Sequence, residues 1–206
     1  MPGADLLAAV LAGYLLGAIP SGVMIGRVRG VDPRGSGSGR IGTTNALRTL
    51  GPALAVLVLL LDLGKGALAV LAGAWLADAL GSASAWPAAL AGVAAVLGHI
   101  RSVFIGFGGG RGVATGGGAM LALAPLTMVP VTLVFLVLVW RTRYVSLGSI
   151  GAAVTLSLAA AVLYALDLAG LPVVVAAASI GVLVILSHAD NIERLRAGTE
   201  RKLGHG

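Results

Sequence analysis

The stretch GSGSGRIGTTNALR, residues 35–48, forms a polar and basic island between two long apolar segments. Its four glycines alternate with small hydroxyl residues, and glycine readily adopts the positive φ angles that turn successive N–H groups toward one anion. Arg40 and Arg48 add planar guanidinium groups, which suit phosphate. A helix capped by Thr43 or Thr44 would direct its positive end at the same anion. The stretch therefore predicts a phosphate cradle, and a flexible glycine-serine connector is the alternative.

The apolar segments on both sides of this island indicate a membrane protein. Hydrophobic residues make up 58% and charged residues 11% of the 206 residues, whereas soluble domains carry roughly 25% charged residues. We therefore predict an all-α integral membrane protein with a single membrane-embedded domain over residues 1–206. The chain has no cysteine, so disulfides and thiolate metal sites are excluded.

Seven membrane helices, some of them short, are expected from the apolar segments and from the residues that break them. Proline disfavours a continuous helix across residues 112–140, so we divide this segment near Pro125. Asp62 and Lys65 interrupt the apolar composition of the second segment, which is still expected to form one span. The expected helices cover residues 4–26, 52–77, 86–98, 112–140 (as two helices), 147–166 and 172–187.

Positive charge is confined to one set of the predicted loops. All Lys and Arg residues except Lys65 lie in residues 27–48, 99–111 and 141–143 and in the C-terminal tail. With seven crossings these segments share one side, which the positive-inside rule assigns to the cytoplasm. The N-terminus is then outside and the C-terminus inside, and both glycine-rich loops are cytoplasmic. The distribution of the net charge of +6 argues against a nucleic-acid partner.

A second glycine-rich island reads FGGGRGVATGGG, residues 107–118. Residues 108–112, around Arg111, predict another backbone anion site that contains a cation. The island lacks the G-x-x-x-x-G-K-[ST] spacing of a Walker loop. The glycines at 116–118 are interpreted as small residues that permit helix contact. His99, before the island, is interpreted as hydrogen-bonded scaffolding.

Two further pairs of polar residues admit two interpretations each. Asp62 and Lys65 are three residues apart, so they can pair on one helix face, and charges within a membrane span are commonly functional. A structural pair that pins neighbouring loops is the alternative. Ser146 and Ser149 stand at a predicted helix start, where they are either caps or residues that face a site.

His188, Asn191 and Arg194 are spaced three residues apart after the last apolar segment. This spacing places them on one helical face, and Glu200 follows in the tail. A solvated tail is the usual interpretation of such a mixed-charge run. The regular spacing beside the membrane instead favours the wall of a binding site.

Together these motifs resemble the bacterial acyl-phosphate-dependent glycerol-3-phosphate acyltransferases, the PlsY family, over nearly the whole chain. The matching motifs are IPSG at 19–22, D-x-R at 32–34, S-G-x-x-G-x-T-N-x-x-R at 38–48, DLGKG at 62–66, GH at 98–99, F-x-G-G-x-G-V-A-T at 107–115, YVSLGSI at 144–150 and H-x-x-N-I-x-R-L-x-x-G-T-E at 188–200. The family implies seven helices in the bacterial inner membrane and a cytoplasmic active site. Its reaction moves a fatty acyl group from acyl phosphate to the 1-hydroxyl of glycerol 3-phosphate. The products are lysophosphatidic acid and phosphate, in the first step of phospholipid synthesis.

The resemblance also implies roles for individual positions. Residues 38–48 look like the first phosphate loop, residues 109–112 look like the glycerol 3-phosphate loop, and His188 and Asn191 resemble ligand contacts. The catalytic candidates are Ser38, Arg48, His188 and Asn191. The substrate-binding candidates are Gly39, Thr44, Asn45, Lys65, Gly109, Gly110, Arg111, Gly112, Ser146, Ser149 and Glu200. Arg40 and Arg111 stand where the family usually has Asn and Lys. Arg111 keeps the charge but changes the donor geometry, and the added charge at Arg40 is expected to affect substrate preference or rate more than the fold.

The chemistry of this reaction fits the residues. Acyl phosphate already carries a good leaving group, and the sequence has neither an H-x-x-x-x-D pair nor a G-x-S-x-G nucleophile motif. We expect catalysis by positioning and charge stabilisation, with substrate phosphate or His188 taking the hydroxyl proton, and with no metal or cofactor. The expected partners are acyl phosphate, glycerol 3-phosphate, membrane lipid and, functionally, the enzyme that produces acyl phosphate. A small transporter or a non-catalytic lipid-binding paralogue is the alternative.

Overall fold

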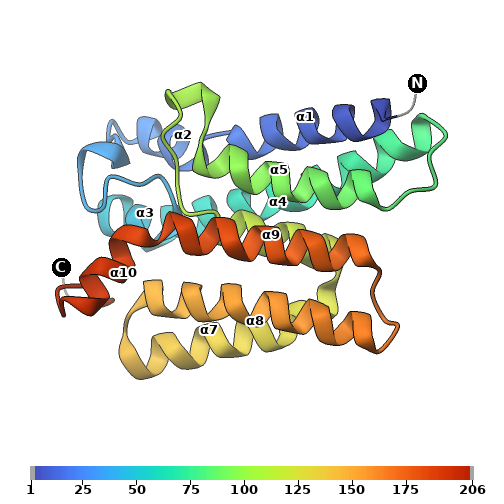
Figure 1. Ribbon diagram of the computed structural model, residues 1–206. Helices are drawn as coiled ribbons and strands as arrows, with labels where there is room; N and C mark the ends of the chain where they lie inside the picture. Colours follow the sequence, from blue (N-terminus) through green and yellow to red (C-terminus); the bar gives the residue numbers. More distant parts are fainter. Residues whose placement is uncertain (1–2, 205–206) are drawn as a thin grey trace. The chain divides into compact units, whose positions relative to one another are not determined.

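All regular structure in the described part of the chain, residues 3–204, is helical (Figure 1). The computed structural model contains ten α-helices and three short 3-10 helices over these residues, which confirms the all-α prediction for them. The chain divides into two compact units, Met1–Leu123 and Ala124–Gly206, and each is described by itself. Residues 1–2 and 205–206, the chain ends assigned above to opposite sides of the membrane, lie outside the described residues.

The first unit is a bundle in which α1 packs on α4 and α5, and α4 packs on α6 (Figure 1). Small residues permit this packing, since a side chain at Gly13 or Gly17 of α1 would collide with the backbone of Ala91 or Ala95 of α5. The elements of this unit are α1 (Ala4–Ala18), α2 (Ser21–Val28), η1 (Pro33–Gly35), α3 (Thr43–Leu50), α4 (Pro52–Ala79), α5 (Trp86–Ile100), η2 (Val103–Ile105) and α6 (Val113–Leu123).

The contact between α4 and α6 follows the same principle. A side chain at Gly118 would collide with the backbone of Leu63, and one at Gly66 would collide with the backbone of Thr115. At Gly118 this confirms that the second glycine run includes a position that permits helix contact.

The first predicted helix is broken, which corrects the expectation of one helix over residues 4–26. α1 ends at Ala18, and Ile19 has a ψ of 116°, which is not helical. Pro20 disfavours a helical conformation of the residue before it and has no N–H to donate. The helical path resumes as α2 at Ser21, so the break leaves backbone oxygens near the end of α1 available to other donors.

α4 is one helix, as expected for residues 52–77, and it continues through Asp62 and Lys65, whose charges pair with each other inside it. One other local prediction is wrong. The N-cap of α3 is Gly42, and neither Thr43 nor Thr44 caps it, since Thr43 is already the first helical residue and the cap has no side-chain hydrogen bond. The positive end of α3 is still at the glycine-rich loop.

The second unit is a set of antiparallel helices in which α8 packs between α7 and α9 (Figure 1). The turn predicted near Pro125 is confirmed, because η3 follows α6 there and α7 begins after it. The elements are η3 (Pro125–Thr127), α7 (Met128–Thr142), α8 (Val145–Ala165), α9 (Leu171–Ser187) and α10 (Ala189–Arg196). α10 bends away from α9 by 57°.

Several of these helices have the length and composition of membrane spans. Five helical segments of the described residues meet this test, and a sixth does if α9 and α10 are counted as one bent span. α6 is apolar but has only 11 residues. Large apolar side chains such as Leu7 and Leu11 on α1 are exposed, as expected for helices that face lipid. The count of seven crossings remains a prediction.

Candidate functional site

Asn45 holds the first glycine-rich loop in shape. Its side chain is buried, and its Nδ2 group donates to the backbone oxygens of Pro33 (2.7 Å), Ser36 (3.2 Å) and Arg40 (2.8 Å). Its Oδ1 atom accepts the backbone N–H of Ser38 at 2.8 Å. The carboxamide of Asn45 therefore bonds to the backbone of the loop and fixes the shape of the predicted phosphate cradle.

This bracing brings the other candidates of the first loop to the start of α3. Ser38 is held there by its bond to Asn45, Gly39 donates its N–H to the backbone oxygen of Ser36 at 3.1 Å, and Thr44 lies in the first turn of the helix. Arg48 is four residues after Thr44, so the two share a helix face, and its side chain is exposed. The arrangement presents hydroxyl, backbone and guanidinium donors that suit an anion.

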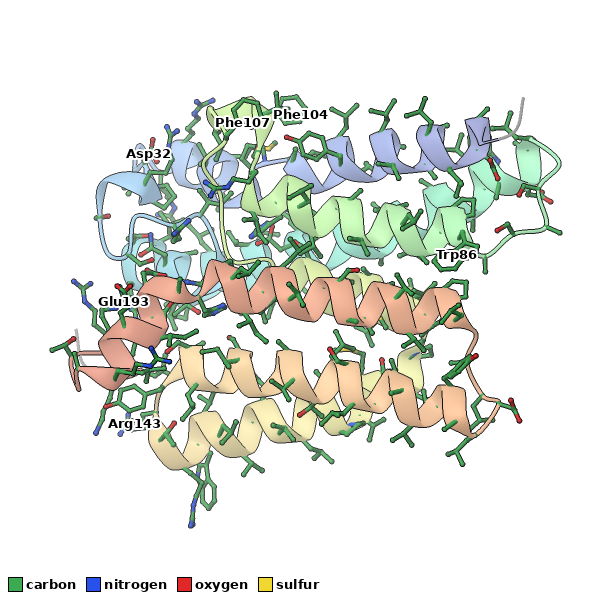
Figure 2. The ribbon with its side chains drawn as sticks, in the orientation of Figure 1. Asp32, Trp86, Phe104, Phe107, Arg143 and Glu193 are labelled. Carbon is green, nitrogen blue, oxygen red and sulfur yellow. The ribbon has the colours of Figure 1, made fainter. Side chains whose placement is uncertain are left out.

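Asp32 and Arg34 fix the beginning of the same loop (Figure 2 labels Asp32). The Arg34 side chain donates to both carboxylate oxygens, with an Nη2–Oδ2 distance of 2.6 Å, and its backbone N–H donates to Oδ1 at 2.9 Å. These donors lower the pKa of Asp32 to about 2, so it stays ionised. It is the only acid among residues 27–48, and the loop therefore remains net positive.

The second glycine-rich loop folds back onto the end of α5. The backbone N–H of Gly110 donates to the oxygen of His99 at 3.1 Å, and that of Ser102 donates to Gly108 at 2.9 Å. Phe107, labelled in Figure 2, donates its N–H to Ser102 at 2.8 Å and has a φ of 60°. Residues other than glycine rarely adopt this conformation, so the loop backbone is tightly constrained.

Close packing explains the predicted glycines of this loop. A side chain at Gly109 would collide with the carbonyl oxygens of His99 and Ile100, and one at Gly110 would collide with the His99 ring. Gly112 has a φ of 79° and accepts the N–H of Gly116 in the first turn of α6. The loop thus lies directly on α5, with Arg111 half-buried between these glycines.

Asp62 and Lys65 form a buried ion pair that ties three parts of the first unit together. Lys65 Nζ lies 2.9 Å from Asp62 Oδ1 and donates to the backbone oxygen of Ile19 at 2.8 Å. The same carboxylate oxygen lies 3.6 Å from His99 Nδ1. These contacts support the interpretation of the pair as structural and of His99 as scaffolding. The candidate Lys65 is only 5% exposed.

Two positioning residues were not found by sequence reasoning. The Ser102 hydroxyl donates to the backbone oxygen of Ala18, and the Tyr14 hydroxyl donates to the backbone oxygen of Arg101 at 2.7 Å. Both bonds fasten the start of the second loop to the end of α1. Pro20 is the sequence signal that could have indicated acceptors near Ala18, because a helix that ends at a proline leaves backbone oxygens unsatisfied.

In the second unit, Glu200 gathers three donors. Its Oε1 atom accepts from Ser146 Oγ (2.7 Å) and Asn191 Nδ2 (2.6 Å), and its Oε2 atom accepts from Arg194 Nε (2.8 Å). Burial raises the pKa of this carboxyl, but the three hydrogen bonds outweigh burial and hold the pKa below its ordinary value. The tail is therefore folded back on α8 and α10, which contradicts the alternative of a solvated tail.

His188 and Asn191 lie together at the start of α10. His188 is buried and precedes the helix, and its Nδ1 atom lies 2.8 Å from the backbone oxygen of Val184. A carbonyl can only accept, so Nδ1 carries the hydrogen and Nε2 is the basic nitrogen. Asn191 is buried too, and its Oδ1 atom has no hydrogen-bond partner among the described residues.

The two serines of α8 are not caps, because the N-cap of this helix is Tyr144. Ser146 donates to Glu200 as described, so it belongs to the same cluster as Asn191. Ser149 donates to the backbone oxygen of Val145 at 2.9 Å. Ser149 is therefore engaged with its own helix, and within the second unit the structure joins Ser146, Asn191 and Glu200 directly.

No group of three or more His, Cys, Asp or Glu residues within residues 3–204 is placed to hold a metal ion.

Comparisons with known proteins give one consistent result. A family model described as glycerol-3-phosphate acyltransferase matches residues 7–198. Curated proteins of that name are similar: one from Geobacter sulfurreducens is 45% identical over 92% of this chain and 93% of its own length, and one from a Synechococcus strain is 49% identical over 96% and 94%. The crystal structure of PlsY, an integral membrane glycerol 3-phosphate acyltransferase, in its glycerol 3-phosphate form has a TM-score of 0.84 and 40% identity, over 97% of this chain and 96% of that one. A lysophosphatidic acid form of PlsY matches with a TM-score of 0.83 and 39% identity, over 97% and 95%.

Proposed function

This chain belongs to the glycerol-3-phosphate acyltransferase family, and we propose that it transfers a fatty acyl group from acyl phosphate to the 1-hydroxyl of glycerol 3-phosphate. The observation that carries the proposal is the match to solved PlsY structures over nearly the whole chain. One was solved with glycerol 3-phosphate and the other with lysophosphatidic acid, which are the substrate and product of this reaction. The transporter and the non-catalytic paralogue are not favoured.

The two glycine-rich loops of the first unit are the proposed phosphate sites. The loop braced by Asn45 presents Ser38, Thr44 and Arg48 to one phosphate. The loop held on α5 presents the backbone of residues 109–112 and the Arg111 guanidinium to the other, which we take as that of glycerol 3-phosphate. Basic groups and backbone donors suit phosphate in both loops. Substrate contacts of Gly39, Gly109, Gly110 and Gly112 would be made through their backbone.

The transfer needs no covalent intermediate with the enzyme. The 1-hydroxyl oxygen of glycerol 3-phosphate bonds to the carbonyl carbon of the acyl phosphate, and the bond from that carbon to the bridging oxygen breaks. Phosphate leaves with the electron pair, stabilised by the donors of its loop. The hydroxyl proton passes to a substrate phosphate oxygen. In the second unit, His188 and Asn191 are proposed as further polar ligand contacts.

The roles of the remaining candidates are indirect. Lys65 and Asn45 support loops through the bonds described above, and Glu200 holds Asn191 and Ser146 in place. Ser149 contributes to the fold of α8. No resident metal or cofactor has a part in this scheme. Functional coupling to the enzyme that produces acyl phosphate would follow from the reactivity of that substrate.

We further propose seven crossings of a bacterial inner membrane, with α6 as the shortest. The charge distribution favours an external N-terminus and a cytoplasmic C-terminus, with both loops on the cytoplasmic side. The whole of residues 1–206 would form one membrane-embedded acyltransferase domain. Reporter fusions at each end test this topology, and a C-terminal reporter that is active outside the cytoplasm would refute it.

The donor is tested with purified protein in detergent or lipid. Acyl phosphate and glycerol 3-phosphate should give lysophosphatidic acid and phosphate in equal amounts, whereas the acyl thioesters of coenzyme A and acyl carrier protein should give none. A chain active with a thioester and inactive with acyl phosphate would overturn the proposed donor but not the acceptor. Absence of lysophosphatidic acid with every donor would favour the non-catalytic paralogue.

A further inference from the structure

The His99 imidazole lies between a buried carboxylate and the second glycine-rich loop. Its Nδ1 atom is 3.6 Å from Asp62 Oδ1, and only 3% of the residue is exposed. The opposite edge of the ring faces Gly110. A Cβ atom built at Gly110 would overlap His99 Nε2 and would lie 2.9 Å from Cε1 and 3.0 Å from Cδ2. The ring therefore fills the space between the ion pair and the loop.

Gly109, one residue earlier, provides an internal comparison. The three atoms nearest to a Cβ atom built there all belong to the backbone: they are the oxygens of His99 and Ile100 and the carbonyl carbon of Ile100. The two neighbouring glycines thus approach the end of α5 closely for different reasons. The approach of Gly110 is limited first by the side chain at position 99, whereas that of Gly109 is limited first by the backbone.

The ring is itself held by buried groups. Asp62 is 1% exposed and is paired with Lys65, which in turn donates to the backbone oxygen of Ile19. The His99 ring is held by packing, because its Nδ1 atom makes no hydrogen bond to Asp62, and a side chain packed in this way loses little rotamer freedom when a ligand binds. The loop that contains Gly110 also bonds back to the His99 backbone at 3.1 Å. His99 therefore contacts the loop through both its backbone and its ring.

We propose that His99 is a positioning residue, whose ring, packed between Asp62 and the loop, sets the position of the Gly110 backbone and so the geometry of the phosphate site formed by residues 109–112. The inference rests on the proposed assignment of this loop to glycerol 3-phosphate. His99 does not touch the substrate in this scheme. Its ring determines how closely the loop backbone approaches α5. It would thereby affect the binding of glycerol 3-phosphate more than that of acyl phosphate.

The test is a double-mutant cycle between Gly110→Ala and His99→Asn. The Asn amide can replace Nδ1 beside Asp62, but it lacks the ring edge that a methyl group at position 110 would strike. Gly110→Ala alone should raise the KM for glycerol 3-phosphate by about tenfold or more, and His99→Asn alone by a smaller factor. The double variant should have a KM well below the product of the two effects, since residues in contact couple by roughly 2- to 150-fold.

Gly109→Ala is the matched control. Its methyl group would strike backbone oxygens, so His99→Asn should not relieve it, and the effects of Gly109→Ala and His99→Asn should multiply. The KM for acyl phosphate should change little in all of these variants, and thermal unfolding of each purified variant reports whether it is folded. If His99→Asn fails to fold, the same cycle is run with His99→Ala.

The outcomes distinguish the positioning role of His99 from the assignment of the loop to glycerol 3-phosphate. Multiplicative effects of Gly110→Ala and His99→Asn would overturn the positioning role. Coupling that appears in the KM for acyl phosphate would keep the positioning role and overturn the assignment of the loop to glycerol 3-phosphate. Equal coupling of His99→Asn to Gly109→Ala and to Gly110→Ala would show a general loosening of α5, which would also contradict the proposal.

Discussion

Replacement of Asn45 by Ala should abolish most activity while the helices remain folded. The change removes four hydrogen bonds, three donated to backbone oxygens and one accepted from Ser38. A buried hydrogen bond contributes about 0.5–1.5 kcal/mol net, and some of the freed loop groups will find water. The distorted loop should therefore stabilise the transition state less, by about 2–4 kcal/mol, which is equivalent to a decrease in kcat/KM of roughly 30- to 1,000-fold.

The assay is initial-rate kinetics with each substrate varied in turn, together with circular dichroism of the purified variant. Thr49→Val is the matched control, because Thr49 lies in the same helix and its hydroxyl only bonds back to the Asn45 backbone oxygen. It should retain nearly full activity. An Asn45→Ala variant within threefold of the wild-type kcat/KM would refute the claim that this carboxamide shapes a working loop.

Three further predictions follow from the site. Arg111→Ala should raise the KM for glycerol 3-phosphate by about 30-fold or more, because a charged hydrogen bond is lost. Arg111→Lys should keep substantial activity because the charge is retained. An unchanged KM in Arg111→Ala would show that this loop does not bind glycerol 3-phosphate. Because the folded-state pKa of Glu200 lies below its ordinary value of 4.5, its stabilising effect is present above pH 4.5 and is lost as the pH falls through the lower folded-state value. The melting temperature of Glu200→Gln should therefore fall less on acidification than that of the wild type. Parallel curves of melting temperature against pH for the two proteins would contradict this. Chelators should leave activity unchanged, and loss that a single divalent ion restores would show a metal requirement.

The helices were largely predictable because apolar length and proline dominate their boundaries. The division near Pro125 is one example, since proline in a helix interior removes a helical hydrogen bond. The break at Ile19 was missed even though Pro20 marks it, because the apolar composition continues across the break and hides it. The pairing of Asp62 with Lys65 inside the long helix α4 was predictable, because a spacing of three residues places both side chains on one helix face.

The sequence predicted which motifs form the candidate site, but not the hydrogen bonds that hold those motifs in place. Glycine, hydroxyl and arginine residues at close spacing identify the two loops from local chemistry alone. The bonds that hold those loops join distant parts of the chain, such as Lys65 to Ile19 and Ser102 to Ala18. No local pattern specifies such a partner. For the same reason Asn45 was expected at the substrate, whereas its bonds are made within the loop.

The central claim is that the acyl group passes directly from one bound substrate to the other. Isotope exchange tests this most directly: purified protein is incubated with acyl phosphate and labelled inorganic phosphate in the absence of glycerol 3-phosphate. Direct transfer predicts that no label enters the acyl phosphate, because phosphate leaves only when the acceptor hydroxyl attacks. Label that enters acyl phosphate at a rate comparable to turnover would reveal an acyl-enzyme intermediate and would contradict the account.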